Sequence, residues 1–442
     1  MATRPSVAVV PFGARAGRTE AGAWARQLAR RLVERFADDA GLELRPVFLV
    51  AMPEASSDAG YLVFGSSPDP DLAASYAGSL GATHALTATY REDGAGRAID
   101  LVLVDAKTRR AAATVTLDIP VDALHEAEPR AAAWLASALG VSPSVNVLAP
   151  AAASERAYAA LLEAMDEEVS ATLLRQSDPA RADAALARAL AGHLAAARAD
   201  PASAAPEERI LVLAAESLER GDVTQEIGAL EELVSSRPRS WRAHYVLGQL
   251  RAERGDTNGA IVAFEHAHAV RALPDHDVVR LAELYANAGA VAPALAHLRR
   301  IAATSAAYGA AQELLAIVAF QRGDLGAGEE AFARAIAAGS VSWELHASHG
   351  AARHAKGETA MAAARYRDAI AAGGPAAVRL NLARVLLAAG DRMAARAELE
   401  TLLATERTGE VASHARRLRL GLGAPDLERD LERAGQAALA GE

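Results

Sequence analysis

The 442-residue chain contains no cysteine, so disulfide bonds, thiolate metal sites and a cysteine nucleophile are all excluded. Lysine is nearly absent as well: it occurs only as Lys107 and Lys356, and arginine supplies the other basic charge. Aromatic residues make up 4% of the chain, whereas about half of it is apolar and much of that is alanine. Such a composition favours closely packed helices over a thick aromatic core.

The chain also lacks the basic stripe that nucleic-acid binding requires. Its net charge is −10, and its densest basic stretches, Arg30-Arg31 and Arg416-Arg417, are short and interleaved with apolar residues. No apolar run reaches the length of a membrane span, and residues 1–10 lack the pattern of a signal peptide. We therefore expect a cytoplasmic protein that neither binds nucleic acid nor inserts into a membrane, with homo-oligomerisation left open.

What the chain does contain is a ladder of six glycines, spaced 34, 34, 34, 34 and 33 residues apart. Relative to each glycine, a small residue recurs seven positions upstream, a leucine (once a histidine) eight upstream, and a large residue nine downstream. A fixed period of this length is typical of stacked repeat units. The glycines are Gly221, Gly255, Gly289, Gly323, Gly357 and Gly390, the small residues Ala214, Gly248, Ala282, Ala316, Gly350 and Ala383, the upstream series Leu213, Leu247, Leu281, Leu315, His349 and Leu382, and the large residues Leu230, Phe264, Leu298, Phe332, Tyr366 and Leu399.

Each unit is predicted to be a helix, a tight turn and a second helix. The glycine suits a positive φ at the end of the first helix. An acid after it suits the start of the second, although Ala290 takes that place in the third unit. Another small residue follows five positions past the glycine, except that the first unit has Glu226. The pattern resembles the tetratricopeptide repeat (TPR), which implies a solenoid that presents surfaces to partners.

The first 148 residues show a different pattern, with predicted order β-α-β-α-β-β-β-α. Short apolar runs ended by proline, glycine or turn residues indicate strands, and apolar residues at helical spacing indicate helices. The expected strands are 6–12, 42–50, 83–91, 98–105 and 110–118, and the expected helices are 19–37, 68–80 and 129–139. The turns at 93–96 and 106–108 predict antiparallel hairpins.

Four segments of this region resemble the TolB-like amino-terminal domain of bacterial signalling proteins: 7–12, 80–87, 101–108 and 131–141. In that family the domain often precedes tetratricopeptide repeats, sometimes behind a cyclase or DNA-binding output domain, and we expect no such output domain in this protein. The resemblance implies a compact α/β domain that adds no catalytic residues.

The predicted fold class is therefore an α/β amino-terminal domain followed by an all-α TPR-type solenoid. We expect the TolB-like domain over 1–148, and a linker with a degenerate leading helical pair over 149–206. Six repeats are expected over 207–408, and C-terminal capping helices over 409–442, the last of them spanning Asp426 to Leu439.

Three histidines are the strongest metal-ligand candidates by count, because His346 and His349 share a helix face and His354 is near. However, His349 stands where other units have leucine, and His346 occupies another inter-helix position. We expect packing histidines, and we predict no metal, cofactor or catalytic site.

The concave face, formed by one side of each first helix, is the predicted partner-binding surface. It includes aromatic anchor types that interfaces favour, but not the lysine/asparagine clamp with which co-chaperone repeats hold a terminal carboxylate. The repeat phase assigns to it Arg242, Tyr245, Gln249, Glu253, His276, Glu283, Asn287, Glu313, Ile317, Phe320, Gln321, His354 and Arg384.

The predicted function is a non-enzymatic scaffold or adaptor that binds a peptide or protein along this face, within a larger bacterial assembly. The alternative is a sensory or regulatory module of a signal-transduction system, acting with a separate cyclase, kinase or transcriptional output.

Overall fold

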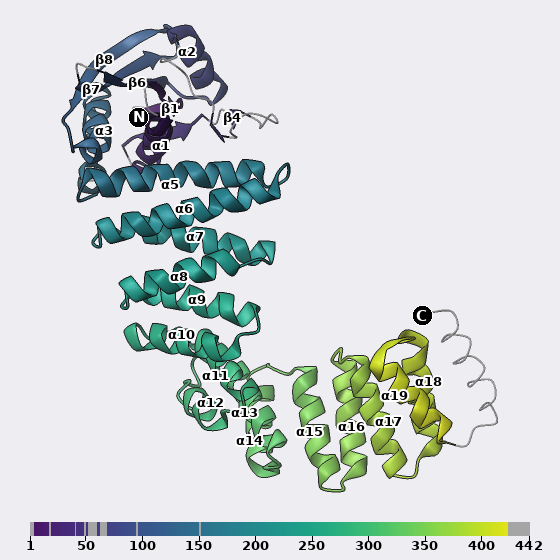
Figure 1. Cartoon of the computed structure of the whole chain (residues 1–442). Coiled ribbons are helices and arrows are strands. Elements are labelled where there is room, and N and C mark those ends of the chain that lie inside the picture. Colours follow the sequence, from purple (N-terminus) through teal and green to yellow (C-terminus); the bar gives the residue numbers. More distant parts are fainter. Residues whose placement is uncertain are drawn as a thin grey trace. The chain divides into compact units, whose positions relative to one another are not determined.

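The computed structural model describes residues 4–16, 19–39, 41–47, 50–51, 60–61, 69–93, 96–149 and 152–422. The chain forms two compact units, Met1–Gly255 and Asp256–Glu442. The predicted fold class is confirmed, because an α/β region precedes a series of helical pairs of the TPR type (Figure 1). The boundaries predicted within the chain stay predictions, and the helix predicted at Asp426–Leu439 lies outside the described residues.

The α/β region is built on a mixed sheet with the order β3-β1-β6-β7-β8. Strand β1 pairs in parallel with β3 and β6, and β6, β7 and β8 form the two antiparallel hairpins predicted from the turns. A strand that the sequence did not indicate, β2, continues along β6 after β1 ends. The strands are β1 (Ser6–Val9), β2 (Gly13–Ala16), β3 (Glu43–Pro46), β6 (His84–Asp93), β7 (Gly96–Asp105) and β8 (Arg110–Ile119), with a separate pair β4 (Val50–Ala51) and β5 (Gly60–Tyr61).

Both faces of this sheet are covered by helices. Successive residues of a strand point to opposite faces, so neighbouring residues of β1 pack into different cores. Val7 and Val9 pack into the larger core with helices α1 (Thr19–Arg35) and α3 (Ala127–Ala138), whereas Ala8 packs with α2 (Pro70–Ser79) on the other face. The expected strand over 42–50 is shorter than predicted, because only Glu43–Pro46 pairs with β1.

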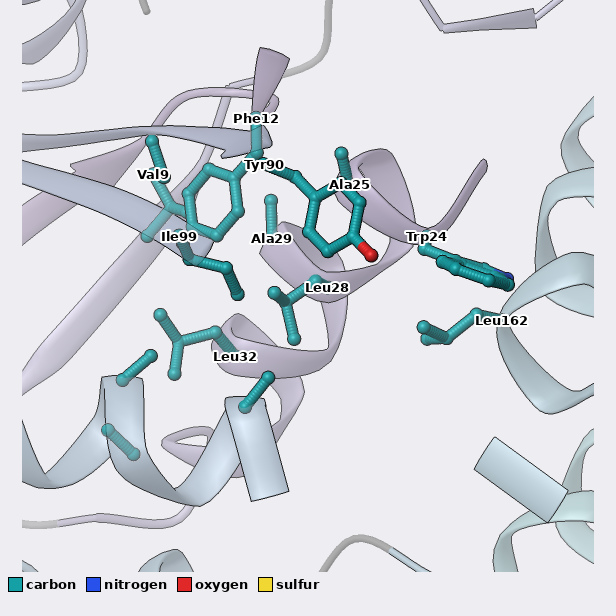
Figure 2. Packing of buried hydrophobic residues seen from close by; sticks show 14 of the residues in the cluster. Val9, Phe12, Trp24, Ala25, Leu28, Ala29, Leu32, Tyr90, Ile99 and Leu162 are labelled. Carbon is teal, nitrogen blue, oxygen red and sulfur yellow. The ribbon is translucent and has the colours of Figure 1, made fainter. Parts of the chain in front are cut away.

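The larger core extends beyond the sheet to helix α5 (Glu155–Leu174). Trp24 of α1 lies next to Leu162 of α5, and its indole nitrogen donates a hydrogen bond to Glu163 at 3.0 Å (Figure 2). Arg26 of α1 forms an ion pair with Asp166 at 2.6 Å. The first helical pair is therefore packed directly on the α/β region.

The end of the predicted amino-terminal domain contains a short helix, α4 (Val145–Leu148), that is held in place by Arg35. The Arg35 guanidinium donates to the carbonyl oxygens of Val147 and Ala149 and pairs with the buried carboxylate of Glu128 at 2.6 Å. Glu128 is fully buried and also accepts a hydrogen bond from the Tyr158 hydroxyl at 2.7 Å. These contacts compensate the desolvation of the Glu128 charge.

Within each unit, the two helices of a repeat pack against each other as the glycine ladder predicts. All six ladder glycines have φ between 75° and 81°, a conformation that L-residues with a side chain rarely adopt. Within each unit the helices neighbour one another in sequence order (Figure 1). The first unit contains α5, α6 (Pro179–Ala199), α7 (Ala205–Arg220), α8 (Thr224–Ser236) and α9 (Trp241–Glu253). The second contains α10 (Thr257–Val270), α11 (Asp275–Asn287), α12 (Val291–Leu298), α13 (Tyr308–Gln321), α14 (Leu325–Ala337), α15 (Trp343–Ala355), α16 (Thr359–Ala371), α17 (Ala376–Ala388), α18 (Arg392–Thr405) and α19 (Gly409–Leu420).

Turn acids cap the second helices, as predicted, in three repeats. The carboxylates of Asp256, Asp324 and Asp391 accept hydrogen bonds from the first-turn N–H groups at 2.9, 3.2 and 3.0 Å. Glu358 instead pairs with Arg353 at 2.5 Å. Ala290 provides no side-chain cap to α12.

The exception at the inner small position, Glu226, has a local explanation. Its side chain is 1% exposed, and its carboxylate accepts a hydrogen bond from Arg220 at 2.6 Å. Burial raises the pKa of Glu226 above its ordinary value. A charged pair therefore fills the space that an alanine occupies in other repeats.

Candidate interaction surface

Four of the predicted concave-face residues lie on α9. Arg242 is exposed and forms an ion pair with Glu208 of α7 at 3.5 Å. Tyr245 is half-buried, contacts the Trp241 ring with centroids 6.4 Å apart, and accepts a hydrogen bond from Gln249 at 3.2 Å. Glu253 is exposed at the end of the helix. The phase of the repeat therefore brings these residues together on one helix with their side chains at or near the surface.

The other predicted residues lie on four first helices of the second unit. His276, Glu283 and Asn287 are exposed on α11, and Arg384 is exposed on α17, where it donates to Asn381 at 3.2 Å. On α13, Gln321 is exposed and Ile317 is half-buried, while Glu313 accepts a hydrogen bond from Ser340 at 2.7 Å. His354 of α15 is half-buried.

Phe320 requires a correction. We expected its ring on the concave surface as an anchor, but the residue is only 2% exposed and belongs to a hydrophobic core with Phe332 and Ala335. The prediction was wrong because Gly328 of α14 offers a space without a side chain, and the Phe320 ring fills that space. An aromatic anchor on this part of the face is therefore absent from α13.

The packing role predicted for two of the histidines is confirmed. The His349 ring is 4% exposed and stacks on Phe320, while His346 packs edge-on against Phe332 with centroids 5.6 Å apart. Burial lowers the pKa of His349 to about 4, with smaller contributions from the nearby charges of Arg365 and His346. Among the described residues, no group of three or more His, Asp and Glu side chains is placed to hold a metal ion.

A groove that the sequence analysis did not predict lies between α12, α13 and α14. It has a volume of about 450 Å³ and is lined by apolar side chains together with three arginines. Its lining comprises Leu295, Arg299, Ile301, Tyr308, Gln312, Leu315, Val318, Ala319, Arg322, Asp324, Ala327, Ala331 and Arg334.

The groove exists because α12 is short. It has 8 residues, whereas the other second helices, α8, α10, α14, α16 and α18, have 13 or 14. Leu315 shows the consequence: it is half-buried, although its equivalents in the other five repeats are at most 7% exposed. The only signal in the sequence is the missing turn acid at Ala290, which marks the start of α12 but does not reveal that it ends at Leu298.

The charges at the groove are mostly positive. Arg334 donates to the buried side-chain oxygen of Gln312 at 2.7 Å and lies 3.7 Å from Glu330. The side chains of Arg299 and Arg322 are exposed and make no hydrogen bond or ion pair with the part of the chain that the structure describes. The one acid of the lining, Asp324, caps α14.

The fold and the surface define a class of protein: a TPR-type array of helical pairs joined to an α/β region. No family model and no curated protein matches the chain. Similar solved structures include Pseudomonas aeruginosa PilF (16% identity, TM-score 0.39, 48% of this chain and 96% of that chain) and the type IV pilus biogenesis factor PilW (17%, 0.41, 46% and 95%). A tetratricopeptide repeat protein from Parabacteroides merdae is similar at 17% identity, with a TM-score of 0.39, over 56% of this chain and 98% of that chain.

Structural likenesses at this level carry no argument. The fold class rests instead on the helices of this chain, on the glycine turns between them and on the positions that are buried. Among the described helices, none combines the length and the apolar character that crossing a membrane requires.

Proposed function

We propose that this chain is a non-enzymatic interaction scaffold or adaptor, which presents the first helices of its repeats to a protein or peptide partner within a larger bacterial assembly. One observation carries the proposal: the residues of α11 divide into two sets. Those that the repeat assigns to packing, such as Leu281 and Ala282, are buried, whereas those assigned to the concave face, His276, Glu283 and Asn287, are exposed. A repeat array holds such helix faces in a preformed arrangement.

The charged groups that are buried between the helices have a structural role. Glu168 of α5 is 5% exposed, and its carboxylate contacts His193 of α6 at 2.6 Å and pairs with Arg209 of α7. Burial alone would raise the pKa of Glu168, but these partners lower it below its ordinary value. The carboxylate thus holds three helices together, as Glu128 does in the α/β region.

The test is affinity capture from a lysate of the source organism, with the full chain as bait and quantitative mass spectrometry as the readout. The concave variant carries Arg242→Glu, Tyr245→Ala, Glu283→Lys and Asn287→Ala. The control carries Val262→Ser and Ile336→Ser, which change exposed residues of second helices. Melting followed by circular dichroism verifies that both variants fold.

We expect a stoichiometric partner on the wild-type chain and on the control, and its loss from the concave variant. A partner that stays on the concave variant would contradict the assigned face. Recovery of no stoichiometric partner by any of the three chains would contradict the scaffold function itself.

A further inference from the structure

We propose that the groove between α12, α13 and α14 binds a short acidic segment of a partner protein, with carboxylates on Arg299 and Arg322 and an apolar side chain over Leu315. This inference rests on the proposed scaffold function and assigns it a second surface. The groove uses Tyr308 and Leu315 of α13 and Arg322 directly after it, on the side of that helix opposite the concave-face residues Glu313 and Ile317.

The first argument is that the shape of the groove comes from a local departure from the repeat. Every other second helix continues for 13 or 14 residues, but α12 ends after 8, so the next first helix is left partly uncovered. Leu315, a core position elsewhere, becomes accessible. A partner that buries this leucine would gain the apolar contact that the chain itself provides in the other repeats.

The second argument is charge. In a chain of net charge −10, arginines are surrounded by acids, and many of them form ion pairs. Arg299 and Arg322 have no such partner in the described chain, and both also line an adjoining hollow formed by residues 289–293 and Leu295. Guanidinium groups bind carboxylates with two parallel hydrogen bonds, so this pair fits an acidic ligand.

A peptide fits the groove better than a nucleic acid does. The apolar part of the lining consists of small and branched side chains such as Val318, Ala319 and Ala331, and Tyr308 is the only aromatic residue among the lining residues. Binding of single-stranded nucleic acid uses several stacking aromatics and a long positive track. The negative charge of the whole chain would also repel a polyanion, whereas a short peptide with two or three carboxylates meets only the local arginines.

The test is a selection of random 12-residue peptides displayed on phage against the purified full chain. Enriched peptides are then synthesised with a fluorescein label, and their binding is measured by fluorescence anisotropy at two salt concentrations. The test variant is Arg299→Glu with Arg322→Glu. The matched control is Arg300→Glu, because Arg300 is exposed and adjacent in sequence but does not line the groove.

We expect enriched peptides that combine Asp or Glu with Leu, Ile or Phe. Their affinity should fall at least tenfold on the double variant, change less than twofold on the control, and weaken with added salt. The inference is overturned by enrichment of basic or uncharged peptides, by equal effects of the two variants, or by tighter binding of a labelled 20-mer of oligothymidine. Failure of the selection to enrich any peptide overturns it as well.

This outcome is separable from that of the proposed function. If the concave variant loses the captured partner while the peptide experiment fails, the scaffold function stands and only the groove is rejected. If the lysate yields no partner and the selection no peptide, both are rejected.

Discussion

The rings of Phe320 and His349 stack face to face, with centroids 4.4 Å apart and planes inclined by 4°. This contact accounts for three departures from the repeat. Phe320 replaces the smaller residues found three positions before most ladder glycines, and His349 replaces a leucine. Gly328 replaces an alanine because the Phe320 ring occupies the space of its side chain. The side chains of two neighbouring repeats are thus complementary in size: the large ring of Phe320 on α13 lies against a glycine on α14 and stacks on a histidine ring on α15.

The first prediction concerns Gly328→Ala. Alanine is the residue of four other repeats at this position and favours helix by ~1 kcal/mol over glycine. Its Cβ would nevertheless overlap the Phe320 ring, so we expect a net loss of ~1–3 kcal/mol in the free energy of unfolding, measured by urea titration. Gly326→Ala, in the first turn of the same helix, should be neutral or slightly stabilising, because an added Cβ would meet only Asp324 Oδ1 at 3.9 Å, an ordinary van der Waals contact. Equal effects of the two substitutions would contradict the packing described.

The second prediction concerns Gly357, whose φ is 79° and whose missing side chain would meet nothing within 4 Å. The cost of Gly357→Ala therefore comes from the backbone alone, and we expect a loss of ~1 kcal/mol. Gly357→Asn should cost less, because asparagine tolerates the left-handed conformation better. Thermal melting of both variants gives the comparison, and a more stable alanine variant would refute the left-handed turn.

The third prediction is a pH dependence caused by His349. Its pKa is about 4 in the folded chain and near 6.5 when unfolded, and its ring accepts a hydrogen bond from Arg353 at 3.2 Å, which requires a neutral nitrogen. Above about pH 6.5 the ring is neutral in both states. As the pH falls from 6.5 to 4, the unfolded chain binds the proton first. The free energy of unfolding therefore decreases by up to ~3 kcal/mol and levels off below pH 4.

Urea titrations between pH 7.5 and 4 measure this decrease. His349→Leu, which restores the residue of the other repeats, should remove this part of the slope. His276→Gln, at a histidine whose side chain is 75% exposed, serves as the comparison for the loss of an imidazole outside the core. An identical slope in wild type and His349→Leu would rule out His349 as the cause.

The fourth prediction concerns the buried pair of Arg220 and Glu226. Arg220→Leu leaves the carboxylate buried without this partner, and we expect a loss of ~3 kcal/mol. Glu226→Ala introduces the residue of most other repeats and should change stability by no more than about 1 kcal/mol, because Arg220 is 27% exposed and can reach water. If both substitutions reduced the free energy of unfolding by similar amounts, the expectation that losing the arginine costs more than losing the carboxylate would be wrong.

The raised pKa of Glu226 adds a check on the same variant. A carboxyl with a folded pKa above its unfolded value binds the proton more readily when folded. The charge of Arg220 lowers this pKa, so its loss raises the pKa further, and the free energy of unfolding of Arg220→Leu should recover relative to wild type as the pH falls toward 4.5.

The repeat itself could be read from the sequence because its signals are local. A glycine with positive φ, a capping acid and alternating small and large residues depend on the conformation of neighbouring residues and on contacts between adjacent helices. Ala316 and Phe332 are accordingly buried where the phase placed them. Strands β6, β7 and β8 were similarly marked by their turns, whereas β2 was not, because four residues pair with β6 only through the tertiary arrangement.

The sequence was less successful at predicting which residues are exposed and which are buried. Phe320 had the correct phase for the concave face, but no periodicity encodes that a glycine on another helix leaves space for its ring. The early end of α12 had no signal either, because no proline or glycine comes directly after Leu298, and the missing turn acid at Ala290 marks only the start of that helix. Glu128 and Arg35, 93 positions apart, likewise meet only in the folded chain.

The sequence by itself determined the period, the turns and the class of fold, because these follow from backbone conformation and from contacts repeated every 34 residues. Only the tertiary structure decided which side chains at those positions are exposed, which charges are paired and where the array opens into a groove. Those properties depend on side-chain volumes and charges that several helices contribute at once. The sequence pattern of any one helix therefore does not predict them.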